Sequence, residues 1–164
     1  MKLDHIGNIP TLISNHISVP LITTRENRLL LEPLLLDGAY IIERNMKALQ
    51  KQKYKVEPLY NESDVYLLMN NVIDKETHQI HKLNDRVSYK FINSGHILGG
   101  CQLILYIKTL SGNTKKIHIT SDLGSSYNKS PFVLERDYVK SSSVSIVEGT
   151  YNDLERGFKS KKQV

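Results

Sequence analysis

The sequence contains a single cysteine, Cys101, among its 164 residues. One cysteine cannot form a disulfide within the chain, so a reducing compartment such as the cytoplasm is the expected location. Zinc sites built from several cysteines are excluded for the same reason. Any metal ion would need histidine and carboxylate ligands instead.

The chain also has no apolar run of the roughly 20 residues that span a bilayer. The longest such run, from Leu29 to Leu36, is interrupted by Glu32 and Pro33. The N-terminus leads into a polar Asp-His pair rather than an apolar segment, so no signal peptide is expected. Internal repeats and low-complexity linkers are absent from the sequence. We therefore expect no membrane partner.

What the sequence does contain is ordinary for a globular domain. Hydrophobic residues make up 40% and charged residues 24%, and 164 residues suffice for one domain with a core. The net charge of +5 weakly favours a polyanionic partner such as nucleic acid. Several basic side chains gather near the C-terminus, where a solvated tail is the simpler interpretation: Arg156, Lys159, Lys161 and Lys162.

Helical patterns dominate the first third of the chain. A short helix is predicted over Ile6–His16, with Pro10 in its first turn, where a missing N–H costs little. A short apolar strand is predicted over Val19–Ile22. Thr23–Glu26 has the spacing of a capping box, which predicts the start of a helix that reaches Lys51.

That long helix is expected to be kinked or delayed by Pro33. Its apolar residues at helical spacing predict one buried stripe: Leu29, Leu30, Leu34, Ile41, Ile42, Met46 and Leu49. Ser63 is expected to cap a further helix over Asp64–Ile73.

The second half of the chain has the period of β-strands. Residues 87–92 alternate as in a strand, and Cys101–Leu110 with Lys115–Thr120 predicts a hairpin around residues 111–113. Val144–Val147 is predicted to be one more, buried strand. Helices followed by paired strands predict a mixed α/β domain of the α+β kind, with helices packed on a mixed sheet.

Four polar segments could carry a functional site, and two of them contain a histidine. Asp4 and His5 could place a carboxylate and an imidazole at one metal ion, although a capping Asp beside an exposed His fits equally simply. His96 lies among three glycines, Gly95, Gly99 and Gly100. Such a tight backbone suggests close approach to a ligand, and the alternative is a hairpin loop with an incidental histidine.

The other two segments carry acidic residues at the ends of predicted strands. Asp122 leaves an apolar strand toward Gly124, where it could coordinate a cation or form an ordinary Asx-turn. Glu148 ends a predicted buried strand, where a carboxylate is costly unless it is paired or near a metal. The alternative is a strand that surfaces at Glu148.

The remaining histidines show no such setting. His118 lies in a strand opposite Ile117 and Ile119 and is expected to face solvent. The other three are scattered: His16, His78 and His81.

In this order, the four segments resemble the site of the metallo-β-lactamase superfamily, in its β-CASP branch of RNA nucleases. That site is written H-x-H-x-D-H, then a G-H-I-L-G-like turn, then an S/G-D-L-G turn, then E-S-T-Y-G. The segments that match are Leu3-Asp4-His5-Ile6-Gly7, Gly95-His96-Ile97-Leu98-Gly99, Ser121-Asp122-Leu123-Gly124 and Glu148-Gly149-Thr150-Tyr151. Each motif alone is weak, whereas the ordered set covers residues 3 to about 156.

The resemblance implies part of an αβ/βα sandwich with up to two zinc ions. Asp4 and His5 would bind one zinc, His96 the other, and Asp122 would bridge them. Glu148 would orient a further histidine, so Asp4 and Glu148 are the residues expected to act in catalysis. Two close metals can turn a bridging water into hydroxide and hold the phosphate that it attacks. The expected substrate is RNA, with DNA as the alternative.

The sequence also departs from that pattern. The first histidine of H-x-H-x-D-H would fall before Met1, and the second falls on Lys2, which repels zinc while protonated. The N-terminal strands and the inserted β-CASP domain of relatives have no counterpart here. Residues 1–164 are therefore expected to form a single partial domain. The missing strands predict an exposed sheet edge through which the chain could self-associate.

Three functions fit these observations. The first is a fragment of a zinc-dependent metallohydrolase that cleaves RNA, expected to be inactive alone because its metal site is incomplete. The second is a catalytically inactive RNA-binding or scaffold protein of the same fold, which Lys2 and the basic tail favour. The third is another hydrolase of the fold, acting on a thioester or a lactone.

Overall fold

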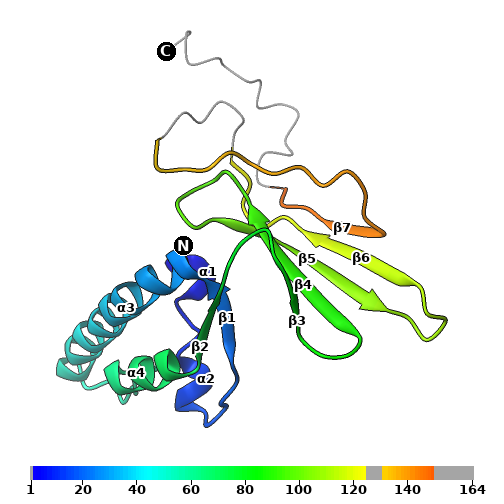
Figure 1. Cartoon of the computed structure of the whole chain (residues 1–164). Helices are drawn as coiled ribbons and strands as arrows, with labels where there is room; N and C mark the ends of the chain where they lie inside the picture. The colour runs from blue at the N-terminus through cyan, green and yellow to red at the C-terminus, as the bar shows by residue number, and fades with distance from the viewer. Residues whose placement is uncertain (1, 125–130, 150–164) are drawn as a thin grey trace.

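The computed structural model describes residues 2–124 and 131–149 of the chain. In these residues, helices and a two-stranded sheet form one half, and a five-stranded sheet forms the other (Figure 1). The helices are α1 (Leu3–Ile6), α2 (Thr11–Ser14), α3 (Arg25–Lys51) and α4 (Glu62–Asn70). The strands are β1 (Leu21–Thr24), β2 (Val72–Lys75), β3 (Ile80–Lys82), β4 (Val87–Asn93), β5 (Cys101–Lys108), β6 (Thr114–Ile119) and β7 (Val144–Ile146).

The helical half, residues 2–75, is built around α3. Apolar side chains from α3, α4 and the start of β2 form its core: Leu31, Leu35, Ala39, Tyr60, Val65, Leu68 and Val72. Strands β1 and β2 are parallel, with Leu21 opposite Val72, and they pair with no other strand among the described residues. These strands place the start of α3 beside the five-stranded sheet.

The predicted long helix is confirmed, and it runs through Pro33 without interruption. Its cap differs from the prediction by one residue, because β1 continues to Thr24. The Thr24 side chain, not that of Thr23, accepts a hydrogen bond from the Asn27 N–H at 3.3 Å. The start of the helix is therefore set at the point where the strand ends.

The predicted apolar stripe of α3 is wrong in its angular position. The fully buried residues are Leu31, Leu35 and Ala39, four apart along the helix. Leu29 is 73% exposed, and Ile41 and Leu49 are also exposed. Apolar residues surround much of this helix, so spacing alone did not identify the side that packs against α4.

Helix α4 begins earlier and ends earlier than predicted. Asn61, not Ser63, is the cap, and it forms a reciprocal capping box with Asp64. The predicted end of this helix, Val72 and Ile73, lies in β2 instead. These β-branched residues satisfy their backbone groups by pairing with β1, which is a contact remote in sequence.

The predicted helix over Ile6–His16 is replaced by two short helices, α1 and α2. The chain turns between them, with the Ile9 N–H donating to the Ile6 carbonyl and the Thr11 N–H to that of Asn8. Helix α2 begins immediately after Pro10. A proline disfavours the helical conformation of the residue before it, so a continuous helix through this point is not expected. As a result, Asp4 and His5 lie within α1 and not before a helix.

The five-stranded sheet has the order β3-β4-β5-β6-β7. Its first three pairings are antiparallel, and β6 pairs with β7 in parallel, so the sheet is mixed. The predicted hairpin of β5 and β6 is confirmed, and so is β4. Strand β7 differs from the prediction because it is not buried: Val144 and Ile146 are more than half exposed.

His118 is buried, contrary to the expectation that it faces solvent. It lies opposite Ile104 in the sheet register, and only 9% of it is exposed. Its Nε2 donates to the Gln102 Oε1 at 2.8 Å, and the Gln102 amide donates in turn to the carbonyls of Asn93 and Asp137. The buried face of this sheet is therefore partly polar, which alternation of apolar residues does not reveal.

Taken together, the described residues form a mixed α+β structure with helices and a mixed sheet, as predicted. The metallo-β-lactamase sandwich and the single partial domain over residues 1–164 stay predictions. Within the described ranges, no helix combines the length and the hydrophobicity needed to cross a membrane. The basic tail residues Arg156, Lys159, Lys161 and Lys162 lie outside the described residues.

Candidate functional site

A cavity of about 230 Å³ lies where the two halves meet. Its walls come from segments that are far apart in the sequence, namely α1, β1, the start of α3, the loop after β4 and the turn after β6. The polar and reactive side chains that line it include Lys2, His5, Asn27, His96, Cys101 and Asp122. The segments that carry the predicted site residues thus converge on one cavity.

The loop that carries His96 is held against the turn that carries Asp122 by two glycines. A Cβ added to Gly124 would lie 1.5 Å from the Gly95 carbonyl oxygen, a distance that no side chain tolerates. Gly95 has φ +70°, a conformation that favours glycine. The Gly124 N–H donates to the Ser94 carbonyl at 2.9 Å. Both glycines are needed for the two segments to approach so closely.

The turn around Asp122 is further shaped by Glu148. One oxygen of its carboxylate accepts the Leu123 N–H at 2.8 Å, and its own N–H donates to the Thr120 hydroxyl at 3.2 Å. Ser121, just before Asp122, has φ 55°, a backbone conformation that residues other than glycine rarely adopt. Glu148, which does not line the cavity, therefore helps to hold the backbone of this turn.

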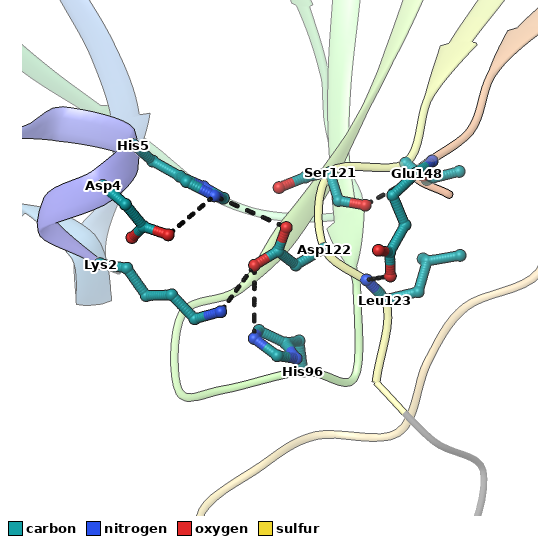
Figure 2. A network of polar contacts seen from close by, with 9 residues as sticks. Lys2, Asp4, His5, His96, Ser121, Asp122, Leu123 and Glu148 are labelled. Atoms are coloured by element: carbon teal, nitrogen blue, oxygen red, sulfur yellow. Dashed lines mark hydrogen bonds and ion pairs between the residues drawn. The ribbon is translucent and has the colours of Figure 1, made fainter. Parts of the chain in front are cut away.

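Asp122 is the centre of the polar cluster (Figure 2). The Lys2 Nζ donates to the Asp122 Oδ2 at 2.8 Å. The His96 Nε2 lies 3.5 Å from the same oxygen, and the His5 Nε2 lies 3.6 Å from the Asp122 Oδ1. Asp4 is more remote, because its carboxylate is 3.8 Å from the His5 Nε2 and its side chain is 67% exposed.

The ion pair perturbs both of its members. The hydrogen bond from Lys2 lowers the pKa of Asp122 below its usual range, with the nearby His5 and His96 contributing in the same direction. The hydrogen bond to Asp122 likewise raises the pKa of Lys2. Both groups are consequently charged at neutral pH, and the pair stays intact there.

Two buried polar atoms at the cavity have no hydrogen-bond partner in the described structure. They are the His96 Nε2 and the Asn27 Oδ1. Buried polar atoms are nearly always paired, so each is a candidate contact for a bound group. Asn27 was not singled out from the sequence. It directly follows the predicted capping box Thr23–Glu26, which carried no signal of a contact to a ligand.

The described residues do not fit a complete zinc site. Zinc in hydrolases takes at least three protein ligands, and no three described His, Cys, Asp or Glu side chains gather for one metal ion. The carboxylate that would bridge two ions already accepts a hydrogen bond from the Lys2 ammonium. A zinc ion at that oxygen would also be repelled by the ammonium charge.

The sequence thus predicted most members of the cluster, although their roles as ligands stay predictions. His5, His96 and Asp122 lie together, with Asp4 at the margin. Glu148 contacts the backbone beside Asp122, and its role in orienting a further histidine stays a prediction. Thr150 and Tyr151, the end of the fourth motif, lie outside the described residues.

Part of the chain matches a curated protein. The chain is 27% identical over 92 residues to the RNase J-like protein of Methanocaldococcus jannaschii. The match covers 56% of this chain and 20% of the relative, so the chain spans about a fifth of the length of the curated relative that it matches. No family model matches the sequence. The chain is therefore similar to part of an RNase J-like protein.

Proposed function

We propose that this chain is part of a metal-dependent nuclease-type hydrolase, and that the cluster around Asp122 belongs to its phosphodiester site. RNA is the proposed substrate, because the protein that it matches is named RNase J-like. The ordered motifs and the RNase J-like match both favour the β-CASP branch of the metallo-β-lactamase superfamily. A cytoplasmic location, favoured by the lone cysteine, belongs to the same proposal.

The observation that carries this proposal is the convergence of His5 and His96 on opposite oxygens of Asp122. These residues come from three separate segments, and each side chain faces the same cavity. Imidazole and carboxylate groups can bind a metal ion or contact a phosphate and its attacking water. The His96 Nε2 is buried without a hydrogen-bond partner among the described residues, which supports a role for this histidine toward a bound group.

Zinc enters the proposal only for a longer protein with further ligands. Such an ion would supply a hydroxide nucleophile and neutralise the phosphate charge. In this chain, Asp122 supplies a carboxylate between the two imidazoles, Glu148 positions its turn, and Gly124 holds the His96 loop against it. We propose that the chain alone does not catalyse the hydrolysis.

A second candidate function has a specific observation in its favour. The Lys2 ammonium is bound to Asp122 at 2.8 Å, where a metal-dependent enzyme needs a free carboxylate. This favours a non-catalytic protein of the same fold that binds RNA or a partner protein. Nothing in the cluster favours a thioester or a lactone as the substrate.

Both candidates are tested with a fluorescein-labelled single-stranded RNA and a DNA of the same sequence. Binding to the purified chain is measured by fluorescence anisotropy, and cleavage on a denaturing gel, with and without zinc. We expect RNA to bind more tightly than DNA. The double substitution His96→Ala and Asp122→Asn should weaken RNA binding, because it removes the centre of the site.

The outcomes separate the candidates. Binding that the double substitution weakens, without cleavage, supports the incomplete or non-catalytic form. Cleavage that depends on zinc would show that the described ligands suffice, contrary to the proposed inactivity of the chain alone. If the double variant binds RNA as tightly as the unsubstituted chain, RNA contacts another surface and the proposed site is wrong.

A further inference from the structure

The cluster around Asp122 has the charge pattern of a cation site. Asp122 and Asp4 supply carboxylates, and His5 and His96 place their imidazole rings beside them. Such a group of side chains is electrostatically unfavourable unless a positive charge lies among them. In the described structure, the side chain that supplies this charge is Lys2.

Lys2 is held in the cluster by charge more than by burial, because its side chain is 41% exposed. Its Nζ donates to the Asp122 Oδ2, and the carboxylates of Asp4 and Glu148 also favour its positive charge. An ammonium is a compact point charge with up to three hydrogen-bond donors. In size and charge it resembles a small cation more closely than a guanidinium does.

The contact also joins distant parts of the molecule. Lys2 precedes α1, whereas Asp122 follows β6, and the two residues are 120 positions apart in the sequence. Both residues line the cavity between the helical half and the five-stranded sheet, and Figure 2 shows the contact between them. A metal ion shared between His5 and Asp122 would make the same connection.

We propose that the Lys2 ammonium is a built-in replacement for a metal ion, neutralising the cluster around Asp122 and linking the two halves without any divalent cation. Lys2 supplies the positive charge that pairs with Asp122, whereas the described side chains do not form a complete metal site. Zinc binds weakly as long as Lys2 is present, because the ion must displace or approach a positive charge. This goes beyond the proposed function, and it holds whether or not the cavity binds RNA.

Zinc affinity of variants at position 2 tests the replacement directly. Zinc chloride is titrated by calorimetry into the whole chain and into its Lys2→Met, Lys2→His and Lys2→Arg variants at pH 7.5. Removing one positive charge beside a divalent ion should raise zinc affinity by about tenfold or more in Lys2→Met. Lys2→His adds a ligand and should bind zinc more tightly still. Lys2→Arg, which keeps the charge, should bind zinc as weakly as the unsubstituted chain.

Two controls separate this site from other zinc-binding groups on the surface. In Lys47→Met, a lysine paired with Glu43 at 2.5 Å is neutralised in the same way. Lys47 is 20 residues beyond Asn27 on α3, so it lies about 30 Å along the helix from the cavity at ~1.5 Å per residue. This variant should leave zinc affinity unchanged. Adding His96→Ala and Asp122→Asn to Lys2→Met should abolish the gained affinity.

Thermal unfolding supplies a second measurement that needs no activity. With EDTA, Lys2→Met should unfold at a lower temperature than the unsubstituted chain, because the carboxylates lose their counter-ion. Zinc should restore the unfolding temperature of Lys2→Met and leave that of the unsubstituted chain nearly unchanged. Circular dichroism checks that each variant is folded. If Lys2→Met does not fold, the effect of zinc on the unfolding temperature is measured with Lys2→His instead.

The proposal is overturned if the unsubstituted chain binds zinc as tightly as Lys2→Met and Lys2→His do. It is also overturned if Lys2→Met in EDTA is as stable as the unsubstituted chain and gains nothing from zinc. Neither result would contradict RNA binding at His96 and Asp122. Conversely, a failure of RNA binding would leave the role of Lys2 unchanged, so the two proposals are separately testable.

Discussion

The two halves of the molecule are stabilised in different ways. The core of the helical half is aliphatic, with Leu31, Leu35, Val65 and Leu68 all at most 1% exposed. The five-stranded sheet and its loops instead bury polar groups, among them Ser94, Gln102, His118 and Thr120. Hydrophobic burial is non-directional, whereas these polar groups are buried at low cost only when each finds its partner.

This difference matters for the site. The segments of the sheet half that carry His96 and Asp122 are positioned by directional hydrogen bonds and a backbone contact between two glycines. The helical half supplies Lys2, His5 and Asn27 to the same cavity. We therefore expect substitutions in the helical core to change stability most, and substitutions in the sheet half to change the geometry of the site as well.

The largest effect is expected from Leu35→Ala. Leu35 is fully buried at the centre of the helical core, so the substitution leaves a cavity and should lower the free energy of unfolding by about 2–5 kcal/mol. Urea unfolding followed by circular dichroism measures this. Leu110→Ala, at a leucine that is 94% exposed, is the control and should change stability by less than about 0.5 kcal/mol. Equal effects would contradict the proposed core.

Gly124→Ala should have the next largest effect. The added methyl group would overlap the Gly95 carbonyl, so the loop and the turn must separate, at a cost of about 1–3 kcal/mol. Gly112→Ala is the control, because it also replaces a loop glycine but finds nothing within 4 Å. Its positive φ of 83° alone should cost about 1 kcal/mol. Only Gly124→Ala should shift the NMR signals of the His96 ring.

His118→Ala tests the buried polar network of the sheet. It leaves the Gln102 Oε1 without its donor and should cost about 1–3 kcal/mol in urea unfolding. Burial, with a contribution from Lys116, lowers the pKa of His118 in the folded state. The unfolded chain therefore binds this proton more readily, so the neutral histidine contributes its stability above its unfolded pKa of about 6.5.

That stability is lost as the pH falls through the lowered folded pKa. Unfolding free energies measured from pH 7.5 to pH 5 should therefore decline more steeply for the unsubstituted chain than for His118→Ala. Parallel curves would show that His118 protonates without cost, and hence that it faces solvent as the sequence suggested.

The smallest effect is expected at the start of α4. Asn61→Ala removes the cap that accepts the Asp64 N–H and should cost about 1 kcal/mol in urea unfolding. Ser63→Ala, at the residue that the sequence indicated as the cap, should change stability by less than about 0.5 kcal/mol. The reverse order would show that α4 begins where the sequence predicted, not at Glu62.

The sequence predicted the elements whose signals are local. The end of α3 at Lys51, strand β4 and the β5–β6 hairpin follow from spacing that neighbouring residues set. Strand β2 was mistaken for the end of a helix, because Val72 and Ile73 become a strand only by pairing with β1. The short strand β3 was missed altogether, since its three residues carry no clear alternation.

The sequence by itself also determined which residue types are at hand: one cysteine, four ordered motifs, and a lysine where the resemblance expects a histidine. Only the tertiary structure decided that Lys2 contacts Asp122, that Asn27 lines the same cavity, and that His118 faces inward. The physical reason is distance along the chain. Periodicity reports which face of an element is apolar, whereas the partner of a charge 120 residues away depends on how whole elements pack.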